Sequence, residues 1–310
     1  MARDESLYNL AQENEVFVFL NYLPKAIEQV IKDIPRNTNT GRRPFPLFDI
    51  LVSLCMQHYI GFSDRRSIGM IKLMTNAAGI RIKVPSFATL NRYRRDPFIK
   101  SLLAKLIEVT SRPMAMLEKD FATDSTGAST SNRSSWYNIR TGKRQTKSDH
   151  VNAHVTVGTV LNAAVAIDID TEVGKHNVYL REHVKRVAKL FTIKDWLGDT
   201  AYCSRRNCDA VAAVGGSPWF KPRAKDRLRA AGVPAWRAMQ KAFKEMPEEA
   251  KGHYHKRSAV ESANSAKKRK FGSVCKTRLP EAQENEEHLK WIAYNFSVLS
   301  RAHYEYGIRL

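Results

Sequence analysis

The sequence feature that most constrains the fold is a change of pattern after Pro113. Up to about residue 118 the apolar residues follow helical spacing. Beyond it there are five short apolar or alternating runs: DFATDSTG, HVNAHVTVGTV, NAAVAIDID, IKDWLGDTAYCS and SPWFKP. The second and third are joined like a hairpin, and helical stretches separate the later ones. Strands that alternate with helices are typical of an α/β domain with a mixed sheet. We therefore predict an α-helical region over residues 1–115 and an α/β domain over residues 116–310.

The N-terminal region contains a candidate recognition helix in SFATLNRYRR, which presents Asn91, Arg92, Arg94 and Arg95. Ser86 is the predicted N-cap of this helix, and Ser63 is the predicted N-cap of the helix before it. Together the two helices can form a helix-turn-helix, although a loop of about ten residues is longer than usual. A helical bundle used for dimerisation is an equally good interpretation.

The charge balance indicates a polyanionic partner. Lys and Arg number 51 against 31 acidic residues, giving a formal charge of +20. Such an excess suits nucleic acid or an anionic membrane surface. The membrane is disfavoured, because no apolar run approaches the roughly 20 residues of a spanning helix. The first ten residues have no apolar signal core, and the four cysteines form no C-x-x-C pair. We expect a cytoplasmic protein that binds DNA, without a zinc site or a disulfide framework.

Two aspartates stand at the predicted carboxyl ends of strands. Asp124 lies in ATDSTG and Asp199 in LGDTAY. Sites in open α/β sheets form outside these strand ends. The alternative is structural: Asp124 can cap a turn with Ser125 and Thr126, and Asp199 can cap the following helix. Because both acids follow an apolar strand and precede small polar residues, a shared functional role is the better interpretation.

The segment YHKRSAVESANSAKKRKFG is predicted to be one helix with a polar stripe. Tyr254, Arg257, Glu261 and Lys268 fall within roughly 60° of one another at 100° per residue. A solvated face with an ordinary Arg257/Glu261 pair is the alternative. Three carboxylates suit hard cations such as Mg²⁺ and Mn²⁺, which prefer oxygen ligands. Cations beside them suit phosphates, and two metal ions can promote an in-line phosphoryl displacement.

These residues resemble a known family. Tyr254, Arg257, Glu261 and Lys268 match the Y-x2-R-x3-E-x6-K signature of DDE transposases from prokaryotic insertion sequences. ATDSTG and LGDTAY are similar to the first and second aspartate motifs of that family, in the same order. NEEHLKWIAYNFSVL resembles its C-terminal segment. The resemblance covers roughly residues 45–310.

The resemblance implies a ribonuclease H-like mixed sheet flanked by helices, preceded by an α-helical N-terminal region. Strands one to three would be antiparallel and the others parallel. Asp124, Asp199 and Glu261 would form a metal-binding catalytic triad for Mg²⁺, with Mn²⁺ as a substitute. Tyr254, Arg257 and Lys268 would contact transposon-end phosphates. About 62 residues separate Asp199 from Glu261, which leaves no room for the β-rich insertion of some relatives.

The implied activity is that of a transposase. Metal-dependent cleavage at the terminal inverted repeats of an element would release a 3′-hydroxyl that attacks target DNA, within a homodimer on the DNA. Two alternatives stay open: a nuclease or junction resolvase of the same fold, and a catalytically silent DNA-binding protein. A divalent-metal titration would distinguish the silent protein from the enzymes.

Further residues are weaker candidates for DNA contact. A basic stretch without acids follows Ser262, and its cations are expected to bind the phosphate backbone: Lys267, Lys268, Arg269, Lys270, Lys276 and Arg278. Trp136 can stack on an unpaired base, and His154 and His176 can neighbour the site. Packing or structural roles are favoured for these three.

Overall fold

The computed structural model describes residues 4–35, 44–130, 140–142, 150–170, 176–223 and 233–310. The chain divides into two compact units. The helical unit comprises residues 1–113, 129–145 and 267–310, and the sheet unit comprises residues 114–128 and 146–266. Each unit is described by itself below. No helix in the described part of the chain combines the length and hydropathy needed to cross a membrane.

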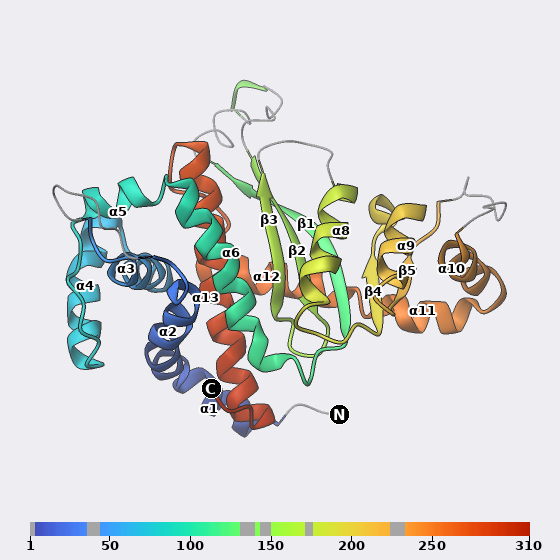
Figure 1. Ribbon diagram of the computed structural model, residues 1–310, viewed down its shortest axis with the longest axis horizontal. Helices are drawn as coiled ribbons and strands as arrows, with labels where there is room; N and C mark the ends of the chain where they lie inside the picture. The colour runs from blue at the N-terminus through green and yellow to red at the C-terminus, as the bar shows by residue number, and fades with distance from the viewer. Residues whose placement is uncertain (1–3, 36–43, 131–139, 143–149, 171–175, 224–232) are drawn as a thin grey trace. The chain divides into compact units, whose positions relative to one another are not determined.

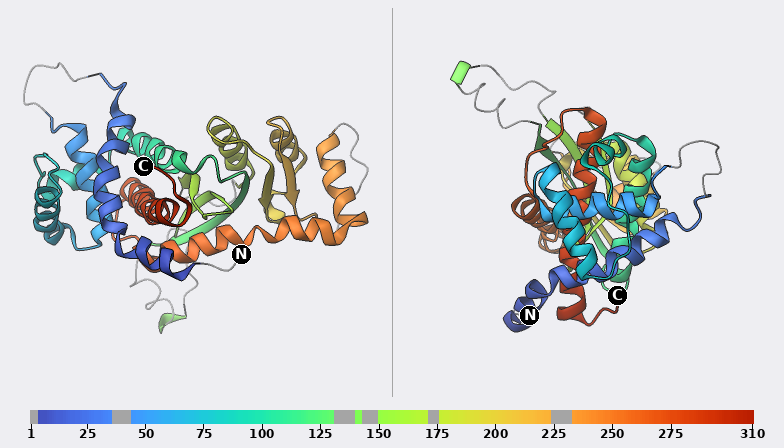
Figure 2. Two further views of the ribbon diagram at one scale, coloured as in Figure 1. Left: turned by 90° about the horizontal axis from the view of Figure 1, so that it is seen from below. Right: turned by 90° about the vertical axis from the view of Figure 1, so that its left-hand side faces the viewer.

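The helical unit is built from both ends of the chain (Figure 1). Its N-terminal helices are α1 (Glu5–Glu13), α2 (Glu15–Ile31), α3 (Leu47–Ile60), α4 (Asp64–Ala77), α5 (Phe87–Tyr93) and α6 (Pro97–Ser111). The last helix is α13 (Pro280–Tyr306), which contacts α1, α2, α3 and α6. Figure 2 shows α13 nearly end-on, with other helices of this unit beside it. Every residue of α13 from Asn285 to Ser300 is buried, so this helix is the centre of the unit.

The sheet unit contains five strands in the order β3-β2-β1-β4-β5. They are β1 (Asp120–Ser129), β2 (His150–Gly158), β3 (Ala164–Asp170), β4 (Asp195–Gly198) and β5 (Ser217–Phe220). Strands β2 and β3 are antiparallel, whereas β1, β4 and β5 are parallel to one another. The predicted α/β class with a mixed sheet is confirmed.

Helices cover both faces of this sheet (Figures 1 and 2). They are α8 (His176–Val187), a 3-10 turn η3 (Thr200–Tyr202), α9 (Arg205–Ala212), α10 (Pro234–Glu245), α11 (Pro247–His255) and α12 (Ser258–Phe271). Helix α8 packs on β2 and β3, and α11 packs on β4 and β5. Fully buried Phe121, Trp196 and Phe220 lie in the core under α8 and α9.

Three local expectations differ from the structure. The predicted helix from Tyr254 is two helices, because α11 ends at His255 and α12 begins at Ser258. Strand β1 continues beyond Asp124 to Ser129, whose backbone pairs with Ser273 and Cys275. The chain also does not divide once at residue 115, because the buried helix α13 needs the N-terminal helices as its packing partners.

Candidate active site

The register of β1 and β4 brings the two aspartates to the same level. Asp120 is paired with Asp195, and Thr123 with Gly198, which is the last residue of β4. Asp124 and Asp199 each follow that last pair by one residue. Neighbouring parallel strands lie about 4.8 Å apart, so the two aspartates are neighbours at the carboxyl end of β4, where parallel strands commonly build sites.

Asp124 lies among charged and hydrogen-bonding groups. Its Oδ1 accepts a hydrogen bond of 2.8 Å from the backbone N–H of Ser125, and its Oδ2 lies 3.7 Å from Nη1 of Arg257. Burial raises the pKa of Asp124, and the negative charges of Asp199 and Glu261 raise it further. The Ser125 N–H and the Arg257 charge oppose this rise. Carboxylates from three distant parts of the chain therefore act on one another.

Asp199 also caps a turn. Its Oδ1 accepts a hydrogen bond of 2.8 Å from the backbone N–H of Ala201, at the start of η3. Both aspartates thus make the local bonds of the structural alternative. Each bond uses only Oδ1, and a carboxylate has a second oxygen with its own lone pairs. The structural and functional interpretations are therefore compatible.

Tyr202 is a member of the site that sequence reasoning missed. Its side chain is buried, and burial raises the pKa of its hydroxyl, as do the nearby charges of Asp124 and Asp199. The only sequence indication was its place three residues after Asp199, in the same motif. Tyr202 keeps a neutral hydroxyl beside the two aspartates.

Arg257 links the aspartates to the third predicted carboxylate. It lies in the turn between α11 and α12, and its Nη2 pairs with Oε1 of Glu261. The same guanidinium stands 5.8 Å from the centre of the Tyr254 ring. The Glu261 side chain is 54% exposed, so it can change partners at little cost. The break between the helices leaves Tyr254, Arg257 and Glu261 together, although they do not share one helix.

The donor set fits a hard divalent cation by its chemistry, since all three side chains offer carboxylate oxygens. Within the described residues, however, no group of three or more His, Cys, Asp or Glu has the spacing to hold a metal ion. The guanidinium of Arg257 contacts Asp124 and Glu261, and its single charge offsets part of their combined negative charge. Joint metal ligation by the three carboxylates therefore requires the exposed Arg257–Glu261 pair to open.

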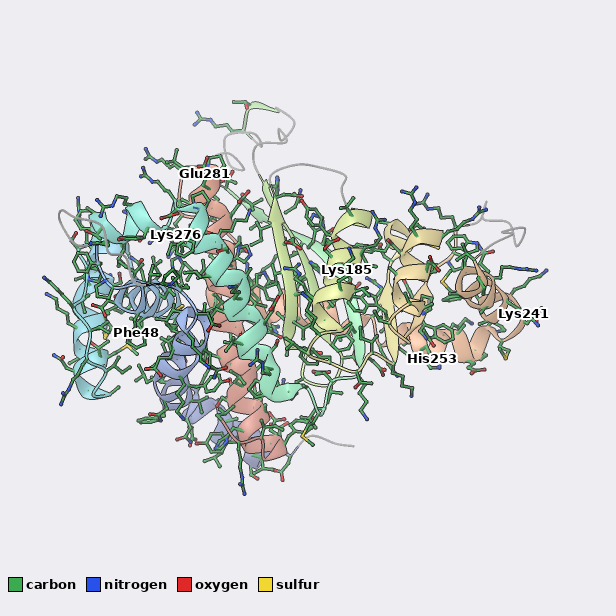
Figure 3. All side chains as sticks on the ribbon, in the orientation of Figure 1. Phe48, Lys185, Lys241, His253, Lys276 and Glu281 are labelled. Atoms are coloured by element: carbon green, nitrogen blue, oxygen red, sulfur yellow. The ribbon has the colours of Figure 1, made fainter. Side chains whose placement is uncertain are left out.

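A second pair of aspartates anchors α11 at the other end of the same strands. Oδ2 of Asp195 lies 2.6 Å from Nδ1 of His253, and its Oδ1 accepts a 3.0 Å bond from the Trp219 indole. The His253 and Trp219 rings are stacked, with centroids 4.3 Å apart. Lys256 adds an ion pair of 2.6 Å with Asp120. Figure 3 labels His253 on α11, beside β4 and β5. These contacts hold the chain immediately before Arg257, and we call them the α11 anchor.

A buried chain of hydrogen bonds supports the strand that carries Asp124. Thr123 accepts a 2.9 Å bond from the Trp196 indole and lies 2.7 Å from the Thr156 hydroxyl. Thr156 in turn lies 2.7 Å from Nδ1 of His183, whose Nε2 is 3.0 Å from Asp168. The order Thr-His-Asp resembles a nucleophilic triad, but Thr156 and His183 are fully buried. A substrate has no access, so this chain is structural.

Two residues predicted to contact DNA are buried and paired with acids. Lys267 is 1% exposed and its Nζ pairs with Glu287. Arg94 is 3% exposed and pairs with Asp64 at 3.3 Å. Neither side chain reaches the surface, so we remove both from the proposed DNA contacts. The sequence could not reveal this burial, because the acidic partners come from distant helices.

The other predicted DNA contacts remain accessible to different degrees. Arg92, Arg95 and Arg269 are exposed, and Lys268 is half-buried. Lys270 pairs with Glu15 at 2.7 Å. His154 is buried against Tyr179, as expected of a structural histidine. His176 is the first residue of α8, and Trp136 lies outside the described residues.

Comparison with known proteins gives one finding. A family model described as a transposase DDE domain matches residues 116–296, more than half of the chain. The match begins just before β1 and ends within α13, so it includes Asp124, Asp199 and Glu261. No curated protein matches the chain.

Proposed function

Because the chain belongs to the transposase DDE domain family, we propose that it is the transposase of an insertion sequence. It cuts DNA at the terminal inverted repeats of the element and joins the cut ends to target DNA, in the cytoplasm and as a homodimer on the DNA. The observation that carries the proposal is the register of β1 and β4, which sets Asp124 beside Asp199. Arg257 then ties Glu261 to the same place.

Asp124, Asp199 and Glu261 are the proposed ligands of Mg²⁺, for which Mn²⁺ can substitute. A bound divalent cation supplies Lewis-acid stabilisation of the phosphoryl oxygens and lowers the pKa of bound water. Burial raises the pKa of Asp124, and the negative charges of Asp199 and Glu261 add to the rise. Such a site favours a cation whenever it is fully ionised.

Arg257, Tyr254 and Lys268 are proposed to hold phosphates near the scissile bond. Arg257 is suited to a bidentate grip on a phosphate, whereas Lys268 acts as a point charge. In the described structure, carboxylates occupy the phosphate-binding groups of Arg257. We propose that Arg257 exchanges Glu261 for a DNA phosphate, which frees the Glu261 carboxylate for metal. Substrate binding and assembly of the site would then be one event.

The test uses DNA that carries the sequences flanking the gene, where the inverted repeats of an element would lie. The purified protein should cut such DNA only with Mg²⁺ or Mn²⁺ and then join the ends to a target plasmid. Asp124→Asn should abolish cutting while DNA binding stays equal or becomes tighter, because a negative charge facing phosphate is lost. Cutting by Asp124→Asn at the normal rate would remove Asp124 from the site.

The same assay separates the alternative functions. Metal-dependent cutting without joining would indicate a nuclease or resolvase. Binding without cutting at any metal concentration would indicate a silent DNA-binding protein. Glu261→Gln provides a second check, because cleavage should be lost although the side chain is exposed and contributes little to folding.

A further inference from the structure

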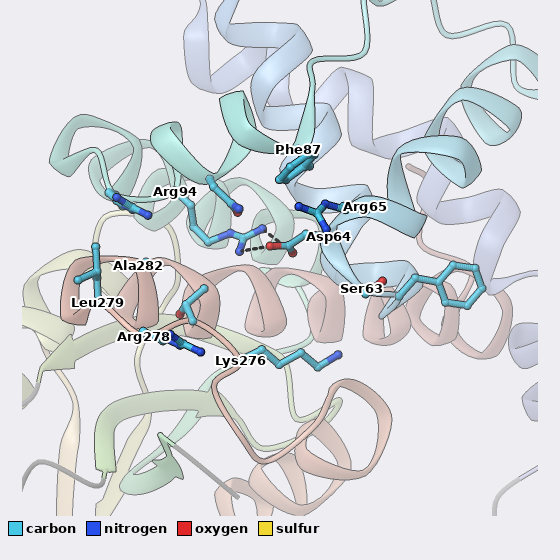
Figure 4. A pocket seen from close by; sticks show the side chains of 13 residues that line it. Ser63, Asp64, Arg65, Phe87, Arg94, Lys276, Arg278, Leu279 and Ala282 are labelled. Atoms are coloured by element: carbon cyan, nitrogen blue, oxygen red, sulfur yellow. Dashed lines mark hydrogen bonds and ion pairs between the residues drawn. The ribbon is translucent and has the colours of Figure 1, made fainter. Parts of the chain in front are cut away.

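A basic cleft in the helical unit lies outside the proposed active site. Its volume is about 570 Å³. Figure 4 shows Arg65, Phe87 and Arg94 on one side of it, and Lys276 and Arg278 on the other. The lining contains five cationic side chains and one carboxylate: Arg65, Arg94, Arg95, Lys276, Arg278 and Asp64. The cleft thus joins α4 and α5 to the loop 272–279, which follows α12.

The single carboxylate of the cleft is already neutralised. Asp64 lies 3.3 Å from Nη2 of Arg94, and its Oδ1 also accepts a 3.0 Å bond from the Gln57 amide. Arg94 itself is 97% buried (3% exposed), and its Nε has no hydrogen-bond partner in the described part of the chain. Because it is buried, Arg94 holds Asp64 in place and is not itself a proposed DNA contact. The remaining four cations leave the cleft positive.

The cationic walls are held in place before any ligand arrives. The guanidinium of Arg65 stands 4.6 Å from the centre of the Phe87 ring. In the loop, the buried Glu286 accepts bonds of 2.8 Å from the N–H of Lys276 and 2.9 Å from that of Thr277. The Lys276 side chain reaches the Gly61 carbonyl at 3.2 Å. Less ordering entropy is lost when such pre-positioned groups bind.

Two helix N-termini also line the cleft. Helix α4 begins beside it at Asp64, and α13 begins beside it at Pro280. Neither N-cap residue, Ser63 or Leu279, makes a side-chain capping bond. Uncapped N-termini offer N–H groups and a positive dipole end, which favour phosphate oxygens. The cleft thereby combines charged side chains and helix dipoles of the same sign.

We propose that this cleft binds the phosphate backbone of duplex DNA. The inference rests on the proposed function and deepens it, because it adds a backbone-binding site built partly from the loop that follows α12. Exposed Lys276 and Arg278 would contact phosphates on one wall, and exposed Arg65 and Arg95 on the other. Arg94 serves as the fixed floor between them. Such contacts fix the register of a protein on DNA without reading its sequence.

The experiment measures the salt dependence of binding to a short fluorescein-labelled duplex of mixed sequence. Each phosphate contact contributes about 0.9 to the slope of log K against log salt. The full-length double variant Lys276→Gln/Arg278→Gln should therefore have a slope less steep by about 1.8. Arg65→Gln/Arg95→Gln, on the opposite wall, should show a similar loss. The matched control is Lys72→Gln/Lys105→Gln, which removes two exposed cations outside the cleft and should keep the wild-type slope.

The outcomes separate this inference from the proposed function. Unchanged slopes for both cleft variants would overturn the cleft as a DNA site, even if the wild-type protein cuts and joins DNA. Equal losses in the cleft variants and the control would overturn it too, because only total charge would then matter. A wild-type protein that binds DNA with the expected slopes but never cuts would overturn the transposase proposal and leave the cleft supported. Thermal unfolding of each variant establishes that it folds.

Discussion

Gly158, the last residue of β2, lies where there is no room for a side chain. A Cβ added there would lie 2.2 Å from Cδ of Glu118, far inside contact distance. The Glu118 carboxylate is buried, and it accepts the N–H groups of Val160 at 2.8 Å and Leu161 at 2.7 Å. These bonds fix the turn between β2 and β3. Glycine at residue 158 is therefore required by the close approach of an acid from before β1.

Gly158→Ala should lower the free energy of unfolding by about 2 kcal/mol, because overpacking forces the carboxylate from its donors. Gly69→Ala is the matched control. Nothing lies within 4 Å of its added Cβ in α4, so it should raise stability by up to about 1 kcal/mol through helix propensity. Urea unfolding of both variants measures the difference. Equal stabilities would contradict the close packing.

Asp124→Asn should stabilise the protein at neutral pH. The pKa of Asp124 is raised in the folded state by burial and by the charges of Asp199 and Glu261. A carboxyl group whose pKa is higher in the folded than in the unfolded state stabilises the fold below its unfolded pKa of about 4. This stabilisation is lost as the pH rises through the folded-state pKa. The melting temperature of Asp124→Asn should thus exceed that of the wild type at pH 7, and the gap should close toward pH 4. A constant gap at all pH values would oppose this account.

Residues differ in how far the sequence could assign them. Asp124 and Asp199 are recognisable candidates, because each follows an apolar run within a short motif. Tyr202 and Gly158 could not be assigned, since their roles depend on Asp124 and Glu118, which lie far away in the sequence. Buried Lys267 and Arg94 were misassigned for the same reason. Their charge is visible in the sequence, but the acids that neutralise them are on other helices.

At the scale of elements, the α11 anchor determines where the site residues lie. The anchor joins His253 and Lys256 to Asp195 and Asp120, the first residues of β4 and β1, four residues before Asp199 and Asp124. The sequence predicted one continuous helix here, because helical spacing persists through Lys256 and Arg257. The turn between α11 and α12 lies next to the α11 anchor. This contact is between residues far apart in the sequence, so helical spacing cannot predict it.

His253→Ala should reduce the turnover of DNA cleavage several-fold and leave DNA affinity nearly unchanged. His253 contacts Asp195 and Trp219, so its loss leaves the chain before Arg257 less firmly held. It removes no proposed phosphate contact. His253→Phe keeps the stacking on Trp219 and should recover part of the turnover. Single-turnover cleavage and fluorescence anisotropy separate the two quantities. A matching fall in affinity would mean that His253 itself contacts DNA.

Lys267 and Lys268 are neighbours on α12 with opposite environments. Lys267→Ala should cost about 3 kcal/mol of stability, because the buried Glu287 would lose one of the two cations, Lys267 and Lys290, that pair with it. Lys268→Ala should leave stability nearly unchanged but weaken cleavage by roughly tenfold, or about 1.4 kcal/mol. Exposed Arg269 is the control for total charge, and Arg269→Ala should alter cleavage much less. Similar cleavage losses for Arg269→Ala and Lys268→Ala would deny Lys268 a specific role.

The whole molecule is organised by a helix from the end of the chain. From the sequence, α13 was assigned to the α/β domain by chain order, although its partners are α1, α2, α3 and α6. Composition and spacing predicted that α13 is a helix, but they cannot identify which surface covers it. The class of each unit was therefore predictable, whereas the division of the chain between units was not.

Removal of residues 1–110 should consequently unfold the remaining helical unit rather than release an intact catalytic domain. The deletion strips away the helices that contact α13, and large apolar side chains buried in that helix would meet water: Leu289, Trp291, Ile292 and Phe296. Exposing each costs roughly 1.5–3 kcal/mol, and the total is comparable with the whole stability of a typical domain. The truncated chain should aggregate or bind a hydrophobic dye strongly, whereas the full chain should not. DNA recognition by the N-terminal helices is better tested with Arg92→Ala/Arg95→Ala in the full chain, since both side chains are exposed. A soluble truncation with native-like unfolding would show that α13 does not depend on the N-terminal helices.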